Sequence, residues 1–132
     1  MRLSGKSILT RFFLLAVFLW GTVITTSIAS AEPAGGTILS ITEDFGNMDT
    51  SISDADLGKL GISLGDSFDL THKATTVSVH FGFTYSDVPE GEWVSFINET
   101  ARLRIARNYE NAAMTLEASI GDEITISPSS MK

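Results

Sequence analysis

The sequence contains no cysteine and only three prolines among its 132 residues. Without cysteine, a domain can form neither a disulfide bond nor a metal site built on thiolates. Small exported domains commonly depend on disulfides, because their hydrophobic cores are small. This chain must therefore be held together by apolar packing and backbone hydrogen bonds.

Basic residues are also scarce. Nine Lys and Arg face sixteen Asp and Glu, which gives a formal net charge of −7 at pH 7. Three of the basic residues, Arg2, Lys6 and Arg11, lie at the N-terminus, so residues 32–132 carry six Lys and Arg against all sixteen acids, a charge of −10. A surface of this charge repels phosphate backbones and anionic lipids, which argues against nucleic acid as a partner.

The N-terminal residues have the organisation of a bacterial secretory signal peptide. An unbroken apolar run at residues 12–20 follows the basic residues, and Ala29-Ser30-Ala31 fits the small-x-small cleavage pattern. We therefore predict a signal peptide at residues 1–31, cleaved before Glu32, and a periplasmic or secreted mature chain with no stable membrane anchor. The alternative is a retained anchor, but residues 12–28 include Gly21 and several Thr and Ser residues and only just reach the ~17–25 apolar residues of a spanning helix.

Beyond the signal, we expect a tether at residues 32–36 and a single domain at residues 37–132, a common size for one domain. Residues 77–85 alternate apolar with polar or small side chains, which is typical of a strand with one buried face. Pro89-Glu90-Gly91 is predicted to link this strand to the next as a hairpin. Further strands are predicted near residues 37–41, 48–52, 67–70, 93–97, 103–106 and 124–126.

One or two short helical turns complete the pattern. Ser53 can cap a helix with Asp54 and Asp56 in its first turn, and Gly61 would end it. Residues 111–116 suit a second turn. Short strands without a long helix indicate a mostly β fold, and a small β-barrel is favoured because closure removes exposed strand edges.

The sequence offers little that indicates catalysis. There is no P-loop, and the lack of cysteine excludes a Cys-His pair. His72 and His80 are the only histidines, their spacing matches no metal site, and we predict that both face solvent. No catalytic residue and no metal ligand is therefore predicted. A pair of carboxylates acting as a hydrolase stays open, because sixteen acids always offer some pair.

Four polar residues lie at predicted turns or strand ends: Asn47, Asn98, Arg107 and Asn108. Amides in such places can cap backbone groups. They can also bind the edge of a heterocycle, because an amide offers a donor beside an acceptor. Arg107 could clamp a carboxylate or a phosphate in bidentate fashion. Both readings, structural capping and a ligand site, stay open from these residues alone.

Six ordered segments of the chain resemble one enzyme family, the S-adenosylmethionine (SAM) hydroxide adenosyltransferases, which are relatives of the SAM-dependent halogenases. The resemblance is to their C-terminal domain and covers residues 38–126. The segments are Asp44-Phe45-Gly46-Asn47, Tyr85-Ser86-Asp87-Val88-Pro89-Glu90-Gly91-Glu92, Phe96-Ile97-Asn98, Leu103-x-Ile105-Ala106 with Asn108, Asn111-Ala112-Ala113, and Gly121-Asp122-Glu123-Ile124.

The resemblance implies a small β-barrel that supplies one wall of a SAM site. In the family, a larger N-terminal domain supplies the other wall, and the site forms between the subunits of a trimer. By this resemblance, the positions that would contact an adenosine-type ligand or SAM are Phe45, Asn47, Tyr85, Asn98, Glu99, Arg107, Asn108 and Tyr109.

Two departures from the family bear on function. The catalytic Asp of the family lies in the N-terminal domain, to which no segment of this sequence corresponds, so the resemblance supplies no catalytic residue. Glu99 stands where the family has a small hydroxyl residue beside the methionine carboxylate. Two carboxylates ~4 Å apart repel by about 1 kcal/mol in water and by more when partly buried, so Glu99 disfavours that orientation of methionine.

We therefore expect an exported, stand-alone module without catalysis of its own, which binds a small nucleoside-like ligand or an exported protein partner. The alternative is one half of a SAM-cleaving, adenosine-forming enzyme that a separate chain completes. No cofactor is predicted beyond a possible SAM or adenosine-type ligand, and self-association as a trimer is implied by the resemblance only.

Overall fold

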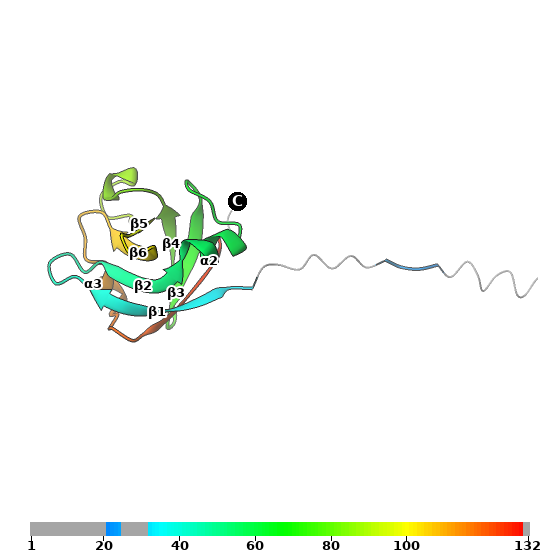
Figure 1. Ribbon diagram of the computed structural model, residues 1–132, viewed down its shortest axis with the longest axis horizontal. Helices are drawn as coiled ribbons and strands as arrows, with labels where there is room; N and C mark the ends of the chain where they lie inside the picture. Colours follow the sequence, from blue (N-terminus) through cyan, green and yellow to red (C-terminus); the bar gives the residue numbers. More distant parts are fainter. Residues whose placement is uncertain (1–20, 25–31, 131–132) are drawn as a thin grey trace, which may run out of the picture.

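The structure is a computed structural model and describes residues 21–24 and 32–130 (Figure 1). Within these ranges, seven strands form a closed barrel in the order β1-β2-β6-β5-β4-β3-β7. The predicted mostly β barrel is confirmed. The signal peptide was predicted at residues that lie almost entirely outside the described ranges. The strands are β1 (Ala34–Ile41), β2 (Met48–Ser53), β3 (Ser67–His72), β4 (Thr75–Phe81), β5 (Trp93–Ile97), β6 (Arg102–Arg107) and β7 (Glu123–Pro128).

The first strand begins earlier than the alternation of its side chains predicts. Residues 34–36, which we expected to belong to a tether, are the start of β1 and pair with β7. Two of these residues are glycines, which have no side chains, so this part of the strand shows no alternation of apolar and polar residues. Gly36 is required there, because a Cβ at this position would lie 2.5 Å from the Ile52 side chain.

The inward side chains fill the barrel with one large apolar cluster. Phe68, Leu70, Val79 and Ile105 are fully buried near its middle. Alternate residues of each strand supply the cluster, as expected for a pleated sheet with one buried face. This packing takes the place of disulfides in holding the domain together.

Both predicted helical turns are present. Helix α2 (Asp54–Lys59) begins at Ser53, whose side chain accepts a hydrogen bond from the Asp56 backbone N–H while the Asp56 carboxylate accepts one from the Ser53 N–H. This reciprocal pair is a capping box. Helix α3 (Ala112–Leu116) begins at Asn111. Of the described helices, neither is long and apolar enough to cross a bilayer.

The strand predicted at residues 77–85 is shorter than expected, and this prediction was wrong at its end. β4 stops at Phe81, and Phe83 is 76% exposed instead of buried. The Asp87 carboxylate accepts hydrogen bonds from the backbone N–H groups of Phe83 and Thr84, at 2.7 and 3.1 Å. These bonds turn the chain into the 3-10 helix η1 (Tyr85–Asp87).

The hairpin predicted at Pro89-Glu90-Gly91 is also wrong. β4 and β5 lie parallel, with His80 opposite Val94 and Phe81 opposite Ser95. Parallel neighbours need a crossing connection in place of a tight turn. Residues 82–92 are that connection, and they include η1. β5 and β6, by contrast, are antiparallel and are joined by a short turn, in which the Ala101 N–H donates to the Asn98 carbonyl.

His72 does not face solvent, contrary to the prediction. It is 1% exposed at the end of β3, and its Nε2 donates to Asp122 Oδ2 at 2.8 Å. Asp122 lies in the turn before β7, so the pair fastens two chain segments fifty positions apart. The pKa of Asp122 lies below its ordinary value of 3.8, chiefly because of the hydrogen bond from His72 and then because of one from the Ser119 N–H.

The His72–Asp122 pair predicts acid sensitivity. A carboxyl with a lowered pKa in the folded state stabilises the fold above its unfolded pKa, and this contribution is lost as the pH falls through the folded-state pKa. We expect the urea midpoint of the native protein to fall more steeply below about pH 4 than that of Asp122→Asn. The exposed neighbour Glu123→Gln is the control and should follow the native profile. Identical profiles for the native protein and Asp122→Asn would contradict this role.

Candidate functional site

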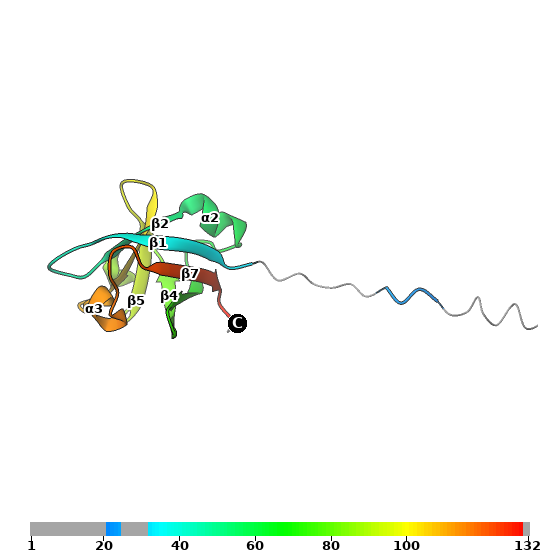
Figure 2. The same ribbon diagram turned by 90° about the horizontal axis from the view of Figure 1, so that it is seen from below.

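A cavity of about 580 Å³ opens at one end of the barrel. Three connections form it: the β1–β2 loop, the segment around η1 and the turn between β6 and α3. Figures 1 and 2 show the β1–β2 loop projecting at the end opposite to the start of β1. The volume is within the range of small-molecule sites. The lining residues are Asp44, Phe45, Asn47, Thr84, Tyr85, Ser86, Arg107, Asn108, Tyr109, Glu110 and Asn111.

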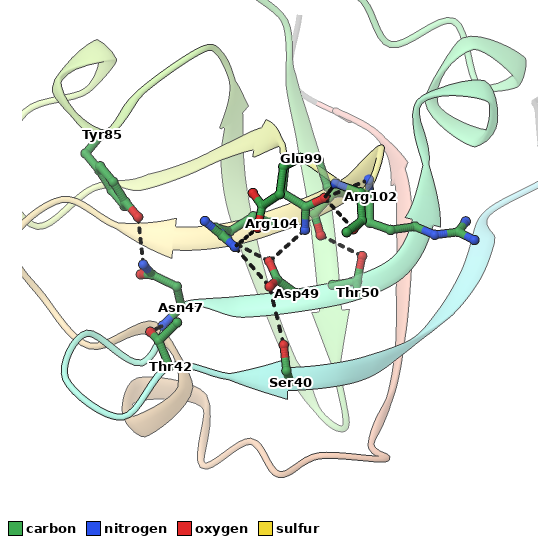
Figure 3. A network of polar contacts seen from close by, with 12 residues as sticks. Ser40, Thr42, Asn47, Asp49, Thr50, Tyr85, Glu99, Arg102 and Arg104 are labelled. Atoms are coloured by element: carbon green, nitrogen blue, oxygen red, sulfur yellow. Dashed lines mark hydrogen bonds and ion pairs between the residues drawn. The ribbon is translucent and has the colours of Figure 1, made fainter.

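Asn47 is the most constrained polar residue of the cavity. It is 4% exposed, and its backbone N–H donates to Thr42 Oγ1 at 3.0 Å. Its Nδ2 donates to the Tyr85 hydroxyl at 2.7 Å (Figure 3). Its Oδ1 is buried and accepts no hydrogen bond from any described residue. An unpaired buried acceptor costs about 1–3 kcal/mol, so a ligand donor that reached this oxygen would recover that cost.

Tyr85 is held on two sides. Its ring meets Phe96 edge to face, with ring centroids 5.1 Å apart and an interplanar angle of 83°. Its hydroxyl contacts Asn47, as described above. The hydrogen bonds to Asp87 fix the backbone of the same segment. Tyr85 therefore stands as a rigid aromatic wall of the cavity although it is 36% exposed.

The turn after β6 presents Tyr109. Arg107 and Glu110 form an isolated antiparallel bridge, and Asn108 is buried with its Nδ2 donating to the Val88 carbonyl at 2.9 Å. Between them, Tyr109 has φ +62° and is 83% exposed. A positive φ is unfavourable for a residue with a side chain and is often found at binding sites. The strained turn thus holds an aromatic ring out over the cavity.

Gly46 and Asn111 join two of the three connections. Gly46 has φ +62°, and a Cβ at this position would overlap the Asn111 side chain. Asn111 Oδ1 accepts from the Met114 N–H at 2.8 Å and caps α3, and the Ala113 N–H donates to the Gly46 carbonyl at 3.0 Å. The β1–β2 loop that carries Asn47 is therefore fixed against α3.

Arg107 borders the cavity but is engaged elsewhere. Its Nε and Nη2 donate to the Gly91 carbonyl at 2.8 and 2.6 Å, and its Nη1 donates to Thr115 Oγ1 at 3.0 Å. The guanidinium also stacks on Trp93, 5.5 Å from the ring centroid. These contacts occupy the Nε–Nη2 edge of the guanidinium and one further donor on Nη1, and they hold the group in place. We assign Arg107 the structural role of fixing the loop before β5.

Asn98 and Glu99 lie away from the cavity. The Asn98 side chain closes the β5–β6 turn, where its Oδ1 accepts from the Thr100 and Arg102 backbone N–H groups and its Nδ2 donates to Asp49 at 3.1 Å. Asp49 and Arg104 form a bidentate pair at 2.7 and 3.0 Å (Figure 3). The pKa of Asp49 is lowered, chiefly by the hydrogen bond from Arg104. Glu99 is 78% exposed, 3.8 Å from Arg104.

The structure therefore brings together six of the eight predicted ligand-binding residues, and their binding role stays a prediction. Phe45, Asn47, Tyr85, Arg107, Asn108 and Tyr109 line the cavity, and Asn98 and Glu99 do not. Sequence reasoning assigned no ligand-binding role to Asp44, Thr84, Ser86, Glu110 or Asn111, which also line it. Most of them adjoin a predicted site residue in the sequence, and that was the one signal that could have identified them.

The cavity has an acidic rim. The exposed carboxyl residues Asp44 and Glu110 line it, and Arg107 is the one cation among the described residues that do, so two negative charges face one positive charge. Carboxylates here favour neutral or cationic ligands over phosphates. Among the described residues, no three His, Asp or Glu side chains gather as metal ligands would.

The fold and the cavity define a small β-barrel with a ligand-sized site at one end. Comparison with protein families identifies the family to which this barrel belongs. Residues 36–125 match the family model of the SAM hydroxide adenosyltransferase C-terminal domain, and the chain belongs to this family. A comparison with curated proteins gave no match.

Two solved structures show the same fold. One is an uncharacterised conserved protein from Thermotoga maritima, with a TM-score of 0.65 and 24% identity over 76% of this chain and 40% of the other. The second is a conserved hypothetical protein from Thermus thermophilus, with a TM-score of 0.52 and 23% identity over 80% of this chain and 40% of the other. The chain thus matches less than half the length of these longer proteins.

The Gly46–Asn111 contact can be tested by comparing two glycines. Gly46 and Gly61 both have positive φ, at +62° and +72°, but Gly61 has open space around it. We expect Gly61→Ala to lower the free energy of unfolding by roughly 1–2 kcal/mol, the cost of the backbone conformation alone. Gly46→Ala should cost roughly 2–4 kcal/mol, because it also displaces the Asn111 cap. Urea unfolding measures both, and equal losses would contradict the proposed contact.

Proposed function

We propose that the chain is an exported binding module whose cavity holds a nucleoside-like ligand and that it performs no catalytic step of its own. The observation that carries the proposal is the buried, unpaired Oδ1 of Asn47 in a cavity bordered by aromatic rings. A heterocycle can stack on such rings while its edge hydrogen-bonds to an amide. Export is proposed on the pattern of residues 1–31.

Charge supports a nucleoside over a nucleotide. Asp44 and Glu110 would repel a phosphate at the cavity mouth, and the single positive charge of Arg107 offsets only one of them. A neutral adenosine or the sulfonium of SAM meets no such repulsion. Export favours a ligand found outside the cytoplasm, and adenosine is the simplest that fits both conditions.

The absence of catalysis is proposed from the part of the family that the chain matches. The matched residues belong to the C-terminal domain. By resemblance, the catalytic Asp belongs to the larger N-terminal domain. The residues that line the cavity include no pair of general acid and base in hydrogen-bond contact.

Titration calorimetry with the purified protein tests the proposal. We expect adenosine to bind and AMP to bind several-fold more weakly, with a difference that shrinks as salt is added. Asn47→Ala should weaken adenosine binding about 10- to 100-fold, because it removes the acceptor that the ring edge meets. Asn98→Ala is the matched control, since it removes an amide of the same family pattern that lies outside the cavity. Absence of binding by adenosine and SAM up to millimolar concentrations would contradict the proposal.

The second candidate is one half of a SAM-cleaving enzyme that a separate chain completes. It is favoured by the exposed aromatic side chains at the cavity end, Phe45, Phe83 and Tyr109, which are 67, 76 and 83% exposed. Apolar surface of this kind commonly marks a binding face. Self-association, as the trimer of the family would require, belongs to this candidate. Adenosine release from SAM only when a second exported chain is added would favour it over the first.

A further inference from the structure

We propose that the first part of β4, residues 75–79, is a docking edge for a second copy of this chain. Two copies would pair their β4 strands antiparallel about a two-fold axis. This surface lies outside the cavity, so the inference is independent of the ligand proposed above. It rests on one seam of the barrel, where two neighbouring strands meet along only part of their length.

The seam between β4 and β5 has the fewest paired residues among the described strands. β4 pairs with β3 at every position from Thr75 to His80, in a register without a shift. With β5 it pairs only at His80 and Phe81. On the side away from β3, no described strand therefore pairs with residues 75–79.

The backbone of β4 points alternately to its two sides. Phe81 donates its N–H to the Asp66 carbonyl, on the β3 side, at 2.8 Å. The next residue, Gly82, donates its N–H to β5, also at 2.8 Å. Because successive residues of a strand direct their backbone groups to opposite sides, those of Thr76 and Ser78 point away from β3. They face the side on which no strand is paired.

Side-chain burial agrees that this edge is open. Val77 and Val79 lie on the inner face of β4, yet Val79 is fully buried and Val77 is only half-buried. Thr75, Thr76 and Ser78 are exposed. A wall continued by a paired strand would cover Val77 as it covers Val79. The edge is therefore accessible to an incoming strand.

The edge also carries none of the usual protection. Free strand edges in natural proteins commonly have a charged side chain, a proline or a bulge, which prevents pairing with another chain. Residues 74–79 read Ala-Thr-Thr-Val-Ser-Val and include no charge and no proline. Their β-branched side chains favour an extended strand. This segment is suited to pair with a further strand.

Symmetry and charge identify the partner as a second copy. An antiparallel copy places Thr76 of each chain opposite Ser78 of the other, and each such pair exchanges two backbone hydrogen bonds. The two copies of Val77 then lie opposite each other as a β-branched cross-strand pair. The chain is strongly acidic, so most of its surface repels a second copy, but this edge sets no like charges opposite one another. Such an interface is isologous, the commonest kind in homodimers.

Sedimentation velocity of the purified protein tests the inference. Thr76→Lys places a charge on the free edge. Thr125→Lys is the matched control, because Thr125 is an exposed threonine of β7, which is paired with β1 and with β3. Both variants change the net charge equally. Thermal unfolding checks that each variant is folded.

We expect the native protein to be in equilibrium between monomer and dimer, with a dissociation constant on the order of 100 µM, because the paired segment is short and the interface small. Added salt should strengthen the dimer by screening the repulsion between two acidic chains. Thr76→Lys should raise the dissociation constant about tenfold or more, because two lysines then meet across the two-fold axis. Thr125→Lys should stay within about twofold of the native protein, since it lies away from the edge.

Ser78→Pro is a second variant, for use if Thr76→Lys is unstable. It removes a backbone N–H of the edge, and proline is tolerated at an edge that is not hydrogen-bonded. It too should weaken the dimer about tenfold, since the two-fold axis removes that donor twice. Hydrogen exchange gives an independent reading. The amides of Thr76 and Ser78 should exchange rapidly in the dilute monomer and slowly in the concentrated dimer.

Several results would overturn the inference. A trimer, or a dimer that neither Thr76→Lys nor Ser78→Pro weakens, would show that self-association uses another surface. Slow exchange of both amides in the monomer would show that the edge is covered within the chain. A monomer at every concentration and salt, with both amides exchanging rapidly, would leave the edge open to a strand of another protein and rule out the second copy. Each of these results leaves the proposed nucleoside binding standing.

Discussion

Closure of the barrel through β7 is the constraint on which the rest of the structure depends. β7 pairs with β1 on one side and with β3 on the other, so the last strand joins the first strand to the remaining sheet. Two backbone hydrogen bonds between Ile38 and the turn at Gly121 and Asp122 set the register of β1 against β7. The side-chain hydrogen bond from His72 to Asp122 holds that turn in place. In a domain without cysteine, a closed sheet around one apolar cluster leaves little strand edge exposed and fixes where every connection leaves the barrel.

The site follows from that closure. Strands β1, β5 and β6 deliver three connections to the same end of the barrel, away from the start of β1 and the end of β7 (Figures 1 and 2). A polar side chain holds each connection in place. Asn111 packs against Gly46 in the β1–β2 loop, and the Asp87 carboxylate accepts from the Phe83 N–H at the start of η1. Asn108, in the turn that carries Tyr109, donates to the Val88 carbonyl. Such rigid loops on a rigid scaffold can leave one amide oxygen unpaired, because the surrounding bonds offset its cost.

Much of the fold could be predicted from the sequence, because strands with one buried face and capped helices have local signatures. Alternation located parts of all seven strands, and Ser53 and Asn111 marked the helix starts. The failures have long-range causes. β4 ends early because the Asp87 carboxylate accepts a hydrogen bond from the backbone of Phe83, earlier in the chain. The parallel pairing of β4 and β5 depends on the closed sheet. His72 is buried because it pairs with Asp122, in a turn fifty positions away. The resemblance named eight site residues, but only three-dimensional structure could separate Asn47, in the cavity, from Asn98, whose amide closes a turn.

The central claim is that a preformed cavity at this end of the barrel binds a nucleoside. The most direct measurement is an NMR titration of the isotopically labelled protein with adenosine, followed at each backbone amide. The account predicts saturable shifts concentrated in residues 44–47, 84–86 and 107–111, with little change at the β5–β6 turn that holds Asn98 and Glu99. Shifts confined to that turn, or no saturable shift anywhere, would contradict it.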